Sequence, residues 1–156
     1  MDDSPNLDTR AIVRSLLLAA TPDEVYKLIS RPDQMTRWFA HRAEVRPFGF
    51  HVEWDESHGT VANDCHVITA VPGQKFAFRW ESVYLGHDNT TVFELTAENG
   101  GCRLDFIETG FGYEREWDYA YTEQSKGWDD VLGRLARLVD TLSAVRDGGE
   151  SGDHGS

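Results

Sequence analysis

Cysteine, ligand-spaced histidine and long apolar runs are all scarce in this 156-residue chain. Its 2 cysteines, Cys65 and Cys102, each lie inside a strand-like run, too few and too isolated for a disulfide framework or a zinc site. The 6 histidines are dispersed without HxxxH-type spacing, so we expect no metal. No apolar run approaches the roughly 18 residues of a spanning helix, and no charged-then-apolar signal segment opens the chain. These absences predict a cytoplasmic protein with reduced thiols and no membrane partner.

Positive charge is also scarce, because the chain has 15 Lys and Arg residues against 27 Asp and Glu residues, which gives a net charge of -12. Six of the acids lie in residues 1–8 and 147–156, which leaves 21 acids against 15 bases, or -6, for residues 9–146. An acidic body without a Lys/Arg cluster argues against nucleic acid as a partner. The composition predicts a flexible N-terminus (1–9), one domain (10–146) and a disordered acidic tail (147–156).

Aromatic residues, by contrast, are plentiful at 12% of the chain, and most follow a strand pattern. From 41 to 109 the chain alternates apolar and polar residues, with turn pairs at Pro72-Gly73 and Asn99-Gly100. Glu108 continues the apolar phase of the final run and is expected to point inward. The inward aromatics of this pattern are Phe50, Trp54, Phe76, Phe78, Trp80, Phe93 and Phe106.

Helical patterns flank this strand region. Thr21-Pro22-Asp23-Glu24 is a capping box that predicts the first of two short helices in tandem over 21–39, after a first strand at 10–20. From Gly127 onward, one long amphipathic helix has apolar residues at Trp128, Val131, Leu132, Leu135, Leu138, Val139, Leu142 and Val145. Since no second long helix can cover that stripe, the fold class is α+β, with a curved antiparallel sheet packed on the last helix.

Three stretches together resemble the Hsp90-ATPase-activator-homologue-like branch of the START/Bet v 1 (SRPBCC) superfamily. They are TPDEVYKLISRPDQMTRWF, the VPGQKF run with Phe78-Arg79-Trp80, and Gly127-Trp128 with the apolar residues behind it. The resemblance covers about 10–146 and implies a helix-grip fold: a seven-stranded antiparallel sheet gripping the C-terminal helix around a hydrophobic cavity. It does not imply Hsp90 activation, because the eukaryotic activator carries a separate N-terminal domain.

A cavity under the last helix is the predicted site, and the alternative is a filled core. Residues 110–122 are its expected mouth, because Gly110 and Gly112 permit close approach and the aromatics that follow suit a rim. The predicted ligand-binding residues are Phe50, Trp54, Phe76, Phe78, Trp80, Phe93, Phe106, Glu108, Tyr113, Trp117, Tyr121, Trp128 and Leu132.

The residues favour binding over catalysis, because no nucleophile stands beside a base and no cofactor motif is present. The first hypothesis is sequestration or carriage of a lipid- or polyketide-like small molecule by a monomer or weak homodimer. The second is a cofactor-independent polyketide cyclase-type enzyme using residues among Glu108, Tyr113, Tyr121 and Asp64. Asp64 shares a strand face with His66 and could pair with it, whereas Arg79 is expected to face solvent.

Two further hypotheses stay open. One is self-resistance, in which the protein traps a reactive natural product such as an enediyne and Gly110 or Gly112 serves as a sacrificial hydrogen donor. The other is a protein-interaction module, which a large exposed apolar patch would favour.

Overall fold

The computed structural model describes residues 10–81 and 87–155. Beyond residue 145 it describes the backbone only. Seven antiparallel strands form one sheet in the order β1-β7-β6-β5-β4-β3-β2. The strands are β1 (Arg10–Leu18), β2 (Arg42–Arg46), β3 (Gly49–Glu56), β4 (Gly59–Val71), β5 (Lys75–Glu81), β6 (Asp88–Glu98) and β7 (Gly101–Phe111). The predicted flexible N-terminus, 1–9, lies outside the described residues.

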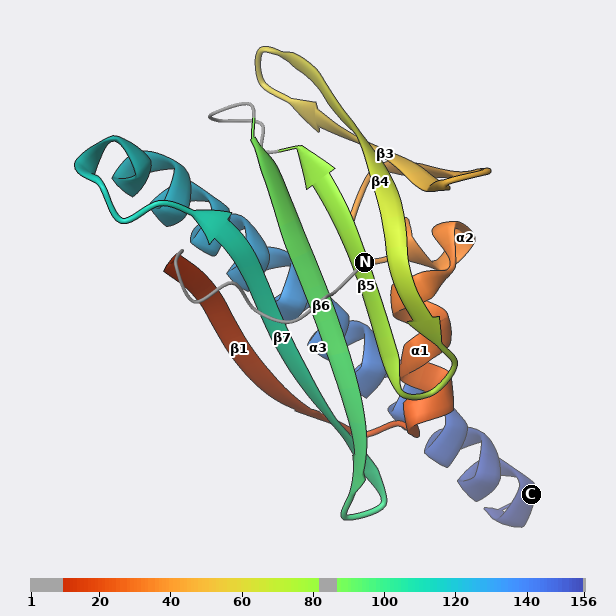
Figure 1. The fold of residues 1–156 in the computed structure, drawn as a ribbon. Coiled ribbons are helices and arrows are strands. Elements are labelled where there is room, and N and C mark those ends of the chain that lie inside the picture. Colours follow the sequence, from red (N-terminus) through yellow and green to blue (C-terminus); the bar gives the residue numbers. More distant parts are fainter. Residues whose placement is uncertain (1–9, 82–86, 156) are drawn as a thin grey trace.

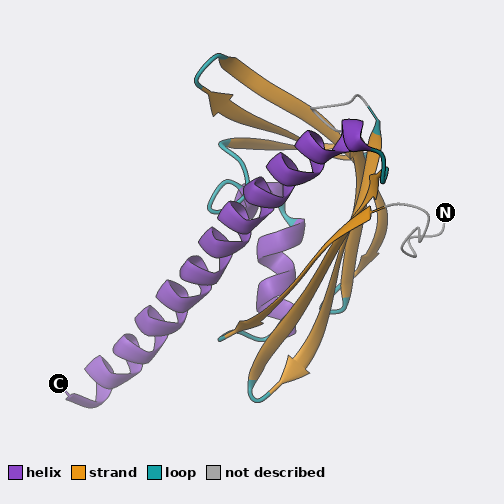
Figure 2. Cartoon of the chain, turned by 90° about the vertical axis from the view of Figure 1, so that its left-hand side faces the viewer, coloured by secondary structure: helices purple, strands orange, loops and turns teal. Residues whose placement is uncertain are grey.

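The helices are α1 (Pro22–Ser30), α2 (Pro32–Met35), the 3-10 turn η1 (Arg115–Trp117) and α3 (Asp118–Gly155). α3 crosses one face of the curved sheet from end to end, with α1 on the same side (Figures 1 and 2). The α+β helix-grip architecture, with two short helices after the first strand, is therefore confirmed.

Local signals explain the first helix. The Thr21 side chain accepts a hydrogen bond from the Glu24 backbone N–H at 3.2 Å, and the Thr21 backbone N–H donates to the Glu24 carboxylate at 2.9 Å. This reciprocal pair is the predicted capping box, with Pro22 at the first helical position. Val25, Leu28 and Ile29 then give α1 its buried face.

The last helix begins nine residues earlier than its apolar stripe indicates, at Asp118 rather than Gly127. Its first two turns carry Ala120 and the half-buried Tyr121 on the buried face in place of large aliphatic residues. The apolar pattern that predicts the helix is therefore weak in these turns. Gly127 is an interior helical residue with open space where a Cβ would stand. The helix also runs through 147–155, where composition predicts disorder; the domain limits themselves stay a prediction.

The sheet opens on one side because β4 and β5 pair over only part of their lengths. Their register runs from Val71↔Lys75 to His66↔Arg79 and stops there, although β4 starts at Gly59 and β5 continues to Glu81. The β3–β4 hairpin consequently bends away from the rest of the sheet, as Figure 1 shows. The two strands flank a gap at this point.

Strand alternation places the core as predicted. Most of the predicted inward aromatics are at most 7% exposed, and Cys65 and Cys102 are buried free thiols. The fully or nearly buried members of the predicted set are Phe50, Phe76, Phe78, Trp80, Phe93 and Phe106, and they meet Trp128, Leu132 and Leu135 of α3. Much of the space under the helix is thus filled by side chains.

Candidate functional site

A groove of about 690 Å³ lies between the first half of α3 and the splayed end of the sheet. The segment after α2, strands β3, β4 and β5, and α3 all contribute to its walls. Its lining residues are Phe39, His41, Trp54, Asp55, Glu56, His58, Val61, Asn63, Trp80, Glu81, Tyr119, Glu123, Gln124, Gly127, Trp128, Asp130, Val131 and Arg134. Its volume falls in the range of sites that take drug-sized molecules.

Four aromatic rings form the floor of this groove. Phe39 stands at the centre, stacked on Trp128 with ring centroids 5.4 Å apart and edge-on to Trp54 at 5.2 Å. Trp80 lies 6.0 Å from both Phe39 and Trp128 and 5.9 Å from Trp54. The Trp54 indole N–H holds the loop in place by donating to the Phe39 carbonyl at 2.6 Å. Trp54 is half-buried, so it offers the largest ring surface to a ligand.

Directly behind this floor lies Glu108, a carboxyl group with 0% exposure. Strand β7 delivers it into the core in phase with Phe106, as the sequence predicts. The Trp128 indole donates to its Oε2 at 2.6 Å, and the Trp80 indole donates to its Oε1 at 3.0 Å. Thr91 Oγ1 donates to Oε1 at 3.1 Å and Gln124 Nε2 to Oε2 at 3.0 Å. Glu108 thus joins three strands to the helix.

Burial decides the protonation of Glu108. Removal from water raises the pKa of this carboxyl to about 7, while the hydrogen bonds from Gln124, Trp128, Trp80 and Thr91 act in the opposite direction. The donors stabilise the charged form, but they do not fully compensate for lost hydration. A carboxyl that exchanges its proton near neutral pH therefore sits one side chain away from the groove.

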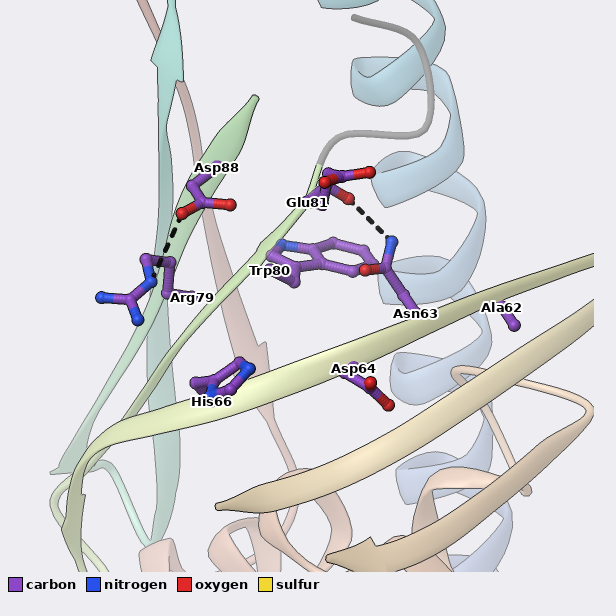
Figure 3. A pocket seen from close by; sticks show the side chains of 8 residues that line it. All are labelled: Ala62, Asn63, Asp64, His66, Arg79, Trp80, Glu81 and Asp88. Carbon is purple, nitrogen blue, oxygen red and sulfur yellow. Dashed lines mark hydrogen bonds and ion pairs between the residues drawn. The ribbon is translucent and has the colours of Figure 1, made fainter. Parts of the chain in front are cut away.

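The gap between β4 and β5 carries a second, outer cavity of about 340 Å³. Asn63, Trp80 and Glu81 line both cavities, so the two meet at the gap. Asn63 Nδ2 spans the opening by donating to the Glu81 carbonyl at 2.7 Å, and Arg79 pairs with Asp88 at 3.5 Å nearby (Figure 3). The unpaired ends of β4 and β5 thereby become walls of a site.

The predicted site residues separate into three groups. Trp54, Trp80 and Trp128 line the groove, and Glu108 contacts two of them. The remaining aromatics of the strands, together with Leu132, are packed core behind that surface; they are Phe50, Phe76, Phe78, Phe93 and Phe106. Their role in binding a ligand stays a prediction.

Of the expected mouth at 110–122, Tyr119 lines the groove, whereas the three predicted aromatics of this segment do not. Tyr113 is 63% exposed, Trp117 packs on His87 with ring centroids 4.3 Å apart, and the Tyr121 hydroxyl donates to the Ala11 carbonyl at 2.9 Å. Tyr121 contacts β1 and β7 through Ala11 and Phe111, and none of the three residues is in the described lining of the groove. A different helix face, carrying Tyr119, reaches the groove.

Gly110 and Gly112, the two glycines expected at the mouth of the site, are tightly packed. A Cβ on Gly112 would clash with the Trp117 indole, and one on Gly110 would stand 2.6 Å from Asn89 Oδ1. Gly110, with φ +123, belongs to strand β7 and not to a loop. Neither glycine lines the groove as described.

One smaller expectation, on β4, changes. Asp64 pairs with His51 on the neighbouring strand, Nδ1 to Oδ1 at 2.7 Å, and not with His66, which stacks on Phe48. The cross-strand register His51↔Asp64 brings those two side chains together, whereas residues two apart on one strand stand farther from each other. Arg79 is half-buried at the outer cavity.

Several groove residues escape sequence reasoning, Phe39 above all. It belongs to a helix-like stretch, and no pattern indicates that it inserts between three indoles. Among the described residues no group of three or more His, Cys, Asp or Glu side chains is arranged so that it could hold a metal ion. No described helix is long and apolar enough to cross a bilayer.

Solved structures share this fold at low identity. Protein MLL2253 from Mesorhizobium loti matches with a TM-score of 0.71 and 19% identity over 85% of this chain and 98% of its own. DynU16, described as a putative protein in the dynemicin biosynthetic locus, matches at 0.70 and 21% over 84% of this chain and 47% of its own. The Aha1 dimer from Colwellia psychrerythraea matches at 0.63 and 14%, over 83% and 96%.

A comparison with curated proteins finds no match. The family model described as Activator of Hsp90 ATPase homolog 1-like protein, in contrast, matches residues 19–140, most of the chain. The matched region includes the capping box, the aromatic floor and Glu108. This chain therefore belongs to the Activator of Hsp90 ATPase homolog 1-like family.

Proposed function

We propose that the protein binds an apolar or aromatic small molecule in the groove and acts by sequestration or carriage. The observation that carries the proposal is the groove of about 690 Å³ with Trp54, Trp80 and Trp128 in its lining. Aromatic floors contribute large apolar contact area, and their indole N–H groups are already satisfied by the protein. A flat ligand would stack there without leaving a donor unpaired.

The class of ligand is proposed on weaker grounds. One structural neighbour, DynU16, is described as belonging to the dynemicin biosynthetic locus, which agrees with a polyketide-like natural product. The groove is built by a single chain, so a monomer or weak homodimer suffices for binding. Trapping a reactive enediyne would be a special case of sequestration; the positions of Gly110 and Gly112 outside the groove lining give no support to a sacrificial glycine.

Gly127 offers a direct test. It lines the groove in the interior of α3, and a Cβ there meets nothing within 4 Å, so Gly127→Leu adds volume to the groove without a clash. We expect saturable binding of N-phenyl-1-naphthylamine by the wild type, seen as increased probe emission. The leucine should weaken that binding about tenfold or more, equivalent to about 1.4 kcal/mol.

The matched control is Gly133→Leu. Gly133 lies on the same helix, outside the groove lining, and its Cβ would approach only the flexible Arg137 side chain at 3.4 Å. Both substitutions remove a helical glycine, which favours the helix by about 1 kcal/mol. No saturable binding by the wild type, or equal weakening in the two variants, would contradict a ligand site in the groove.

A second candidate function is a cofactor-independent polyketide cyclase-type enzyme, because Glu108 can exchange a proton near neutral pH behind Trp80 and Trp128. A substrate would reach it if Gln124 moved aside. On this hypothesis the protein accelerates α-proton exchange of 2-tetralone in D₂O, followed by NMR. Glu108→Gln should abolish the acceleration, and Glu94→Gln, at an exposed carboxylate on β6, should preserve it. Exchange at the buffer rate in the wild type would count against the enzyme.

A further inference from the structure

The walls of the groove carry an excess of negative charge. Carboxylates reach it from β3, from β5 and from α3, so they flank it on more than one side. They are Asp55, Glu56, Glu81, Glu123 and Asp130. Arg134 is the one Lys or Arg among the described lining residues.

Ion pairs compensate only part of this charge. Asp55 is held by Arg42 at 2.7 Å, Glu123 by Lys126 at 3.2 Å and Asp130 by Arg134 at 3.0 Å. Glu56 and Glu81 have no ion pair within the described residues, and both are exposed at the groove. The groove therefore retains about two negative charges after its pairs are counted.

The aromatic floor and this residual charge attract the same kind of group. The face of an indole is the negative end of its quadrupole and binds an ammonium group more strongly than the face of phenylalanine or tyrosine does. Trp54, half-buried on β3, lies on the strand that also carries Asp55 and Glu56. A positive group above this indole would meet attraction from both the ring and the carboxylates.

We infer that the ligand of the groove is an organic cation, an aromatic or apolar body that carries an amine or quaternary ammonium group. The inference rests on the proposed function and adds the charge of the ligand to it. The flat body stacks over the half-buried Trp54, and the ammonium group lies toward Glu56 and Glu81. The net charge of -12 adds long-range attraction for a cation and repulsion for an anion.

A charge series on one scaffold tests the inference. The probes are 2-naphthylmethylammonium, 2-naphthylmethanol and 2-naphthoate, titrated by calorimetry at pH 8 in about 20 mM and in about 500 mM salt. At low salt the ammonium compound should bind about tenfold more tightly than the alcohol, and the naphthoate more weakly than the alcohol. High salt should shrink these differences severalfold, because ions screen exposed charges.

Two double variants separate a local cause from the overall acidity. Glu56→Gln/Glu81→Gln removes the two groove carboxylates that form no ion pair with another described residue, and it should bring the ammonium-to-alcohol ratio down to about 1–3. Glu116→Gln/Asp140→Asn removes the same charge from exposed positions outside the described lining and should preserve the ratio. Binding of the alcohol should be equal in both.

The outcomes distinguish this inference from the proposed function. If none of the three probes binds, the proposed function itself fails. If all three bind with equal affinity, or naphthoate binds best, the groove is a ligand site but the cation inference is wrong. The inference is also wrong if the two double variants lower the ammonium preference equally, because the charge of the whole molecule would then be its cause.

Discussion

Between pH 4 and pH 8 the wild-type protein should lose about 3 kcal/mol of unfolding free energy relative to Glu108→Gln. The pKa of Glu108 is about 7 in the folded protein against 4.5 for an ordinary glutamate, because burial disfavours the charged form. Each pKa unit of difference corresponds to about 1.4 kcal/mol. The side chain is fully buried, so solvent screening does not reduce this figure.

The sign follows from where the proton is held. From about pH 4.5 to pH 7 the folded state keeps a proton on Glu108 that the unfolded state has released, so stability falls as pH rises. The contribution is fully present below pH 4.5 and is lost by the time pH has passed 7. His51, whose pKa is raised by its hydrogen bonds to Asp64 and Glu53, is present in both proteins, so its contribution cancels in the difference.

Urea denaturation of the two proteins across this pH range measures the effect. Glu94→Gln, which removes an exposed carboxylate on the neighbouring strand β6, is the control for the loss of a surface charge. A flat difference for Glu108→Gln as well would show that the pKa of Glu108 is the same in the folded and unfolded protein, and a difference that rises with pH would show that folding lowers this pKa. Its four donors would balance its burial in the first case and outweigh it in the second.

Trp128→Ala should cost about 3–5 kcal/mol of unfolding free energy, the range for removing a large aromatic residue from a core. Trp128 is 2% exposed and lies where sheet and helix meet, 4.5 Å from the Phe106 ring and stacked on Phe39 at 5.4 Å. Its indole also donates the shortest of the hydrogen bonds to Glu108. The alanine variant loses packing and leaves a buried carboxyl with one donor fewer.

Trp128→Phe separates these two contributions. The phenyl ring retains most of the stacking but cannot donate, so the expected loss is about 1–3 kcal/mol, the cost of depriving a buried polar group of a partner. Val145→Ala, on the same helix but 67% exposed, should change stability by less than about 0.5 kcal/mol. If Trp128→Phe proves as stable as the wild type, the indole hydrogen bond does not contribute to stability.

The core face of each strand could be predicted from the sequence because alternation is a local property. Phe76, Phe78 and Trp80 on β5 point inward for the same reason that Phe106 and Glu108 do on β7: successive side chains of a strand alternate between its faces. The capping box at Thr21 is equally local, since its two partners are three residues apart. No knowledge of the rest of the chain was needed for either.

The site was predictable only in part. The spacing of apolar residues along the strands and the last helix identifies Trp54, Trp80 and Trp128 as inward. The same spacing also predicts Phe50 and Phe93 as ligand-binding, and the structure places these two in the filled core. Whether an inward ring lines a groove or fills the core depends on what covers it from another element. That covering is set by residues far away in the chain.

The sequence by itself determined the α+β class, the inward faces of the strands and a buried Glu108. Tertiary structure alone decided that β4 and β5 separate beyond His66↔Arg79, that Phe39 inserts between three indoles, and that the groove has an acidic wall. The physical reason is the distance along the chain over which the interactions act. Periodicity and capping are fixed within a few residues, whereas the end of a strand pairing and the crossing of a helix over a sheet depend on packing across the whole domain.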